Sequence, residues 1–74
     1  MNNKRRKEVA KILVVLQNEQ SKLEGIQNEE HDAFYNMPYG LRESDKGQAA
    51  EEALSHLDDA VSSLNEVIDQ LSTI

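Results

Sequence analysis

The stretch FYNMPYGLRESDKG, residues 34–47, interrupts a chain that otherwise has the pattern of α-helix. It contains the only proline, two of the three glycines and both tyrosines. Pro38 has no backbone N–H and disfavours helical geometry at Met37, so a preceding helix must end there. Gly40 can adopt positive φ without a steric penalty. The stretch therefore predicts a turn at about residues 36–43 between two helices.

Apolar residues before the turn recur with the period of an α-helix, which predicts a helix over about residues 3–35. In heptad terms, column a contains Val9, Leu16 and Leu23, and column d contains Ile12, Ile26 and Ala33. Glu19 and Gln20 weaken this seam in the middle. Gly25 costs about 1 kcal/mol relative to alanine inside a helix, and it is a candidate for a kink or a close helix approach.

The second helix is expected over about residues 44–73. Column a contains Ala50, Leu57, Leu64 and Leu71, column d contains Ala53, Ala60, Val67 and Ile74, and column e contains Leu54, Val61 and Ile68. This apolar stripe is wider than a two-stranded seam requires. Ser44 is a good N-cap, and Asp45 lies where the helix dipole favours an anion. Gly47 occupies the position that glutamate takes in a capping box.

A short connection between two long helices predicts an antiparallel helical hairpin, so residues 1–74 form one all-α domain without strands. Pairing the helix ends across the turn gives a specific register. It places Phe34 near Ala50, Leu16 near Ile68 and Val9 near Ile74.

A lone hairpin has no enclosed core, and this suggests association. The run ILVVL, residues 12–16, covers more than one helical turn, so Val14 or Val15 must face away from the second helix. Small chains without disulfides or metals generally need association, and there is no cysteine here. We expect a homo-oligomeric helical bundle, at least a dimer, rather than a monomeric hairpin. The expected interface residues are Leu13, Val14, Val15, Val61 and Ile68.

The net charge of −6 is distributed unevenly along the chain. The first eleven residues contain the basic side chains Lys4, Arg5, Arg6, Lys7 and Lys11. Residues 43–74 contain eight carboxylates against Lys46. An acidic chain is a poor nucleic-acid binder overall. We expect the basic start to pair with Glu66, Asp69 and the C-terminal carboxylate; the alternative is a polyanion site.

Residues with catalytic or metal-binding chemistry are present but poorly arranged. His31 and His56 lie among acidic residues, yet Asn28 and Ala53 stand where a helical Glu-x-x-His motif needs glutamate. Helical NTP pyrophosphatases use paired carboxylates, but here the two pairs, Glu29 with Asp32 and Glu66 with Asp69, fall at opposite ends of the expected hairpin. We therefore expect no enzyme, metal or cofactor.

No apolar run reaches the roughly 20 residues of a membrane span, and the basic start lacks a signal-peptide core. The expectation is a soluble protein of the host cytoplasm. The carboxylates of the second helix also leave a DNA-mimic interpretation open.

The turn is the better candidate for a ligand site. Its polar and aromatic residues are Tyr35, Asn36, Tyr39, Arg42, Ser44 and Lys46. Aromatic faces, a guanidinium and a helix N-terminus together suit a phosphate or nucleotide. The alternative is a capped turn, because Asn, Pro, Gly and Ser each have turn roles. A hairpin tip is convex, so a pocket would need the loops of several copies.

Three segments carry a resemblance to known proteins: NKRRKE at 3–8, the turn at 34–47, and AEEALSHLDDAVSSLNEVIDQL at 50–71. They resemble small helical-hairpin proteins of bacterial phages and prophages with an Asn-Leu-Pro-x-x-Leu-Gln-x-Ser-Glu turn. Asn36, Pro38, Leu41 and Ser44 match that turn, whereas Met37 and Arg42 replace its Leu and Gln.

The resemblance implies a phage setting, in which small helical oligomers inhibit a host protein or sequester a nucleotide signal of host defence. The leading hypothesis is accordingly a non-enzymatic, counter-defence-like protein that inhibits or sequesters a host factor. The alternatives are a sponge for a small anionic nucleotide bound at oligomer loop ends, and a purely structural helical assembly protein.

Overall fold

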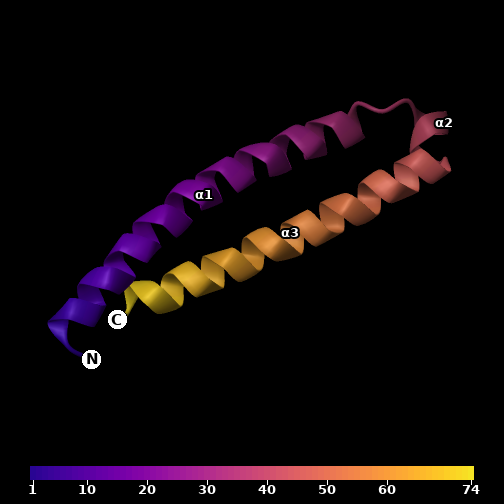
Figure 1. Cartoon of the computed structure of the whole chain (residues 1–74). Helices are drawn as coiled ribbons and strands as arrows, with labels where there is room; N and C mark the ends of the chain where they lie inside the picture. Colours follow the sequence, from indigo (N-terminus) through magenta and orange to yellow (C-terminus); the bar gives the residue numbers. More distant parts are fainter.

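Two long helices, α1 (Asn3–Tyr35) and α3 (Asp45–Ser72), lie side by side and antiparallel (Figure 1). The computed structural model describes residues 1–74 and contains no strand. A single helical turn, α2 (Tyr39–Arg42), forms the tip, and both termini lie at the opposite end. The hairpin measures 58 × 15 × 13 Å, so it is long and thin.

Side-chain caps define where the long helices begin. The Asn2 side chain accepts a hydrogen bond from the backbone N–H of Arg5 at 2.9 Å, and Ser44 accepts one from Gly47 at 3.5 Å. Each cap satisfies one of the N–H groups that a helix start leaves without a partner. α1 ends at Tyr35, and the N–H of Asn36 donates to the carbonyl of Asp32 at 3.0 Å.

The turn differs from the expected loop because part of it is helical. Pro38 precedes α2, and its carbonyl accepts the N–H of Arg42 at 2.9 Å. A proline is compatible with a helix start because its missing N–H would be unpaired there anyway. Gly40 lies inside α2, and no glycine has positive φ, so the conformational freedom expected of Gly40 is not used.

The seam on α1 uses different columns from the expected pair. Column a is correct, with Val9, Leu16 and Leu23 half-buried. Column d is wrong: Ile12 and Ile26 are more than half exposed, and Ala33 is exposed. The second seam column contains instead Leu13, Gln20, Gln27 and Phe34.

The seam on α3 explains this rotation. Leu54, Val61 and Ile68 of column e are buried, whereas Ala60 and Val67 of column d are exposed. Burying Leu, Val and Ile removes more apolar area from water than burying the two alanines of column d. Column e of α3 therefore faces α1. Columns a and e of α1 face α3 in return.

Hydrogen bonds between polar side chains of α1 and α3 define the register of the two helices. Gln20 hydrogen-bonds Asn65, and Gln27 donates to Asp58 at 2.7 Å. The residue numbers in each pair add to 85, and those of the expected pairs add to 83 or 84. The sequence-based register is therefore within two residues of the observed one.

Candidate functional site

Arg42 at the tip is engaged by its own chain. Its guanidinium donates to the carbonyl oxygens of Tyr35 at 2.7 Å and Met37 at 3.4 Å, and it lies 5.4 Å from the centre of the Phe34 ring. A cation at the C-terminus of α1 is attracted by the negative end of the helix dipole and stabilises the helix. Arg42 thus closes the C-terminal end of α1, a role that the residue pattern did not reveal.

The other residues of the expected ligand site divide between turn roles and open surface. Asn36 and Ser44 are helix caps. Tyr35 and Tyr39 are 65% and 76% exposed, and Lys46 is exposed. Tyr35 stacks on His31 of its own helix with ring centres 6.0 Å apart. The structure brings all six residues to one end of the hairpin without enclosing a cavity among them.

The one hollow of the molecule is elsewhere. It is a shallow depression of about 370 Å³ on α3, lined by Gln48, Glu51, Glu52 and Ser55. No group of three His, Asp or Glu side chains has an arrangement that could hold a metal ion. Neither long helix has an apolar stretch sufficient to cross a membrane.

The five residues expected between copies fall into two sets. Val61 and Ile68 are 7% exposed in the seam of the single hairpin, and Leu13 is half-buried there. The structure therefore moves these three from an expected interface into the intramolecular seam. Val14 and Val15 are 56% and 58% exposed, so both face away from α3.

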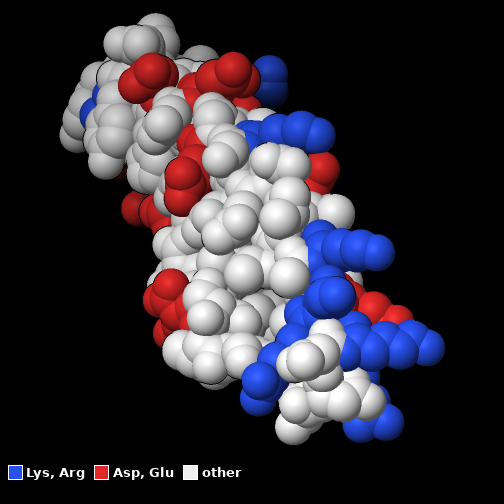
Figure 2. Space-filling model, turned by 90° about the vertical axis from the view of Figure 1, so that its left-hand side faces the viewer, with Lys and Arg blue, Asp and Glu red and all other residues white.

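The basic start of α1 does not pair as expected. The chain forms an ion pair between Lys22 and Glu19 at 3.1 Å, and a hydrogen-bonded contact between His31 and Asp58 at 2.9 Å. Neither involves residues 1–11, and neither uses Glu66, Asp69 or the C-terminal carboxylate. Figure 2 shows Lys and Arg side chains gathered at one end of the molecule and projecting into solvent along one edge.

One side of the seam is polar. His31 and Gln27 both reach Asp58, at 2.9 and 2.7 Å. The hydrogen bond from Gln27, then that from His31, lowers the pKa of Asp58 below its ordinary value of 3.8, because both favour the carboxylate form. This group connects α1 to α3; Gln27 lies about two turns before the end of α1, and Asp58 lies between three and four turns after the start of α3.

The opposite side of the seam is apolar, and we call it the flank face. Its residues occupy column d in both α1 and α3. His31 and Asp58 lie on the polar side of the seam, so column d of α1 and column d of α3 lie beside each other on the opposite side. The flank face consists of Ile12, Ile26, Ala33, Ala53, Ala60, Val67 and Ile74, all exposed. The pattern had assigned them to the interior; the larger side chains of column e were the signal against that.

Comparisons with known proteins add no relative. No protein-family model matches the chain, and neither curated proteins nor solved structures give a match.

Proposed function

We propose that this chain is a non-enzymatic, phage-type helical binding protein that acts as a homo-oligomer. It inhibits or sequesters a host protein by packing α1 against it. Helix packing needs no catalytic group, because apolar burial supplies the affinity and a polar rim supplies the orientation.

The supporting observation is the imbalance between exposed and buried apolar side chains. Ten large apolar residues are at least 40% exposed, whereas three are buried. Scattered exposed residues are ordinary, but contiguous apolar surface marks interaction sites. Ile12, Val14 and Val15 lie within four consecutive residues and point to different sides of α1. The N-terminal half of α1 therefore has exposed apolar side chains on more than one side and can contact more than one protein chain.

Native mass spectrometry of the tagged chain, purified from its host, tests this function. The expected result is a complex of defined mass with one host protein. Val14→Lys should abolish that complex, because a charge replaces an exposed apolar side chain on the proposed contact. Ser62→Lys is the matched control, since it adds the same charge to an exposed position of α3. A complex that persists unchanged in Val14→Lys would contradict the proposal.

The same spectra test the nucleotide alternative, which is favoured by the exposure of Tyr35, Tyr39 and Lys46 at the tip end of the hairpin. A bound mass in the nucleotide range, lost in Tyr39→Ala and Lys46→Ala, would support a sponge at the loop ends. Chains that carry neither protein nor small molecule would support the structural role.

A further inference from the structure

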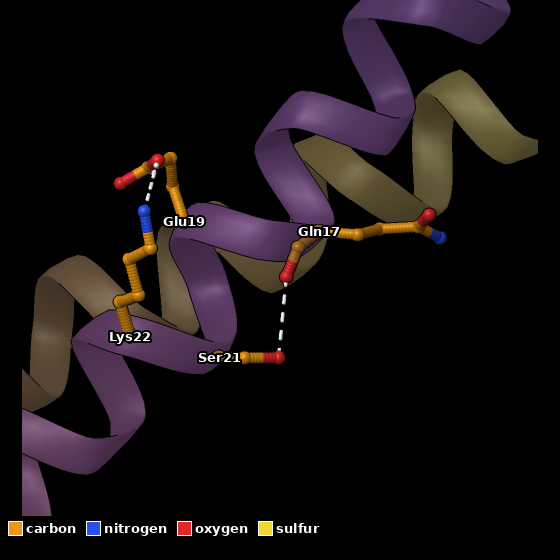
Figure 3. A network of polar contacts seen from close by, with 4 residues as sticks. All are labelled: Gln17, Glu19, Ser21 and Lys22. Carbon is orange, nitrogen blue, oxygen red and sulfur yellow. Dashed lines mark hydrogen bonds and ion pairs between the residues drawn. The ribbon is translucent and has the colours of Figure 1, made fainter.

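The flank face is an apolar surface with no occupant in the single hairpin. Its four large side chains, Ile12, Ile26, Val67 and Ile74, are 43–55% exposed. Glu19 lies in the same column and pairs with Lys22 on its own helix at 3.1 Å (Figure 3). The carboxylate of Glu19 therefore lies at the flank face with the ammonium group of Lys22 beside it.

The two ends of the hairpin carry opposite charge. The terminal end has the five basic residues of segment 4–11, against Glu8, and none of the five forms an ion pair within the chain. The tip end has the carboxylates of Glu29, Glu30, Asp32, Glu43, Asp45, Glu51 and Glu52, against Arg42 and Lys46. Arg42 is already engaged by carbonyl oxygens of the turn. A surface with this polarity attracts a partner whose charges run in the opposite direction.

We propose that a second copy of this chain covers the flank face in antiparallel orientation, with the tip of each hairpin beside the termini of the other. The two copies form a four-helix bundle about a two-fold axis. In a parallel arrangement, the basic ends would lie together and repel each other.

The residue positions fit such an axis at the middle of α1. The helix spans residues 3–35, so its midpoint is residue 19, and the axis carries residue n to the level of residue 38 − n in the other copy. Ile12 then meets Ile26 of the other copy, twice in the dimer. Basic segment 4–11 meets segment 27–34, which contains Glu29, Glu30 and Asp32.

The axis also places the two copies of the Glu19–Lys22 pair near each other. Each carboxylate can then approach a lysine of either chain, so the centre of the interface holds balanced charge rather than two isolated carboxylates. On α3, the same level as segment 27–34 is occupied by residues 51–58, which include Glu51 and Glu52.

The side of the hairpin that contains the flank face is comparable in size to one partner of a stable dimer. This whole side is 58 Å long and 15 Å wide, which gives an outline of about 870 Å². Specific interfaces bury about 800 Å² on each partner.

The mass of the full chain in solution tests the proposal. At micromolar concentration, light scattering should give about 16.8 kDa, twice the 8.4 kDa chain. Ile26→Lys should give the monomer mass with unchanged circular dichroism, because Ile26 is exposed in the single hairpin. Val14→Lys, at a residue exposed to 56%, should leave the dimer mass intact. A monomeric wild type, or equal effects of the two variants, would overturn the proposal.

Cross-linking tests the orientation without disturbing the charges. The chain has no cysteine, so Ile12→Cys and Ile26→Cys each introduce one reactive position. Treated with a short bismaleimide, a mixture of the two variants should yield mainly the link between residue 12 and residue 26. Links of residue 12 to residue 12 would indicate a parallel dimer and overturn the antiparallel arrangement.

The dimer and the host partner can fail separately. Ile26→Lys reports on the contact between copies, and Val14→Lys reports on the proposed host contact. A dimer without a host complex would therefore refute the proposed function and leave this inference standing.

Discussion

At the scale of single residues, the three glycines show how one residue type serves different purposes. A Cβ at Gly25 or Gly40 would meet no atom within 4 Å. A Cβ at Gly47 would overlap the backbone carbonyl group of Arg42. Gly47 is buried where α2 crosses the start of α3, so this is a close approach of two backbones. The sequence alone did not distinguish the three, because the contact depends on the α2 turn, which the pattern did not predict.

Opposite stability changes are expected for alanine at two of these positions. Gly47→Ala should lower the free energy of unfolding by about 1–3 kcal/mol, because the added methyl forces α2 away from α3. Gly25→Ala should raise it by about 0.5–1 kcal/mol, because the site is open and alanine favours helix. Urea denaturation followed by circular dichroism, at one chain concentration, measures both. Similar changes in the two variants would contradict the packing of α2.

Arg42 is expected to contribute to stability, although it stands in an exposed turn of the chain. Arg42→Ala removes two hydrogen bonds to carbonyl oxygens and the contact with Phe34. Hydrogen bonds to charged groups contribute about 1.5–3 kcal/mol when well formed, and partial exposure reduces this, so a loss of about 1–2 kcal/mol is expected. Tyr39→Ala should change the unfolding free energy by less than about 0.5 kcal/mol, since Tyr39 is exposed. Thermal unfolding of both variants provides the comparison.

At the scale of elements, the lengths of α1 and α3 follow from the sequence, and their rotation does not. Periodicity and the capping residues Asn2 and Ser44 identify where apolar stripes begin and end. Choosing which columns face inward requires comparing the volumes of side chains on both helices at once. The side chains of Leu54, Val61 and Ile68 are larger than those of Ala53 and Ala60 and take the inward positions. In α1, Gln20 and Gln27 become half-buried in the seam, although a hydrophobicity pattern places them outside.

The polar layer around Asp58 makes the hairpin sensitive to acid. Because the pKa of Asp58 is lowered by Gln27 and His31, its contribution to stability is present above the ordinary value of 3.8. It is lost as the pH falls below 3.8 through the lowered value, since protonation removes the favoured carboxylate. The difference in melting temperature between wild type and Asp58→Ala should therefore shrink as the pH falls through this range.

Asp59→Ala is the control for acid sensitivity, because the neighbouring carboxylate is exposed and has no hydrogen-bond partner within the chain. Its difference from wild type should not follow the same course. A constant difference for Asp58→Ala down to strongly acid pH would show that the Gln27 and His31 contacts do not stabilise the carboxylate.

At the scale of the whole molecule, the antiparallel hairpin could be predicted because a short turn between two long helices allows few arrangements. The tip residues Tyr35 to Lys46 could be identified as neighbours for the same reason. The turn role of Arg42 could not be predicted, since it depends on carbonyl groups that α2 brings within reach. The flank face was also missed, because α1 is rotated by one column from the expected orientation. This rotation places Leu13 and Gln27 in the seam and leaves Ile12 and Ile26 exposed.

The thinness of the molecule leads to the last prediction, which concerns concentration. Three buried apolar side chains are a small core for 74 residues, so association should add to the stability of a hairpin that folds alone but is only marginally stable. For a dimer that unfolds to two chains, each tenfold rise in chain concentration stabilises the folded state by about 1.4 kcal/mol. With an unfolding entropy typical of about 150 residues, the melting temperature should rise by roughly 4 °C per tenfold step. Ile26→Lys should melt at a lower temperature that is independent of concentration, because the monomer unfolds without dissociating. Calorimetry of both chains from about 5 to 500 μM makes the comparison, and a constant wild-type melting temperature over that range would show that the single hairpin is stable by itself.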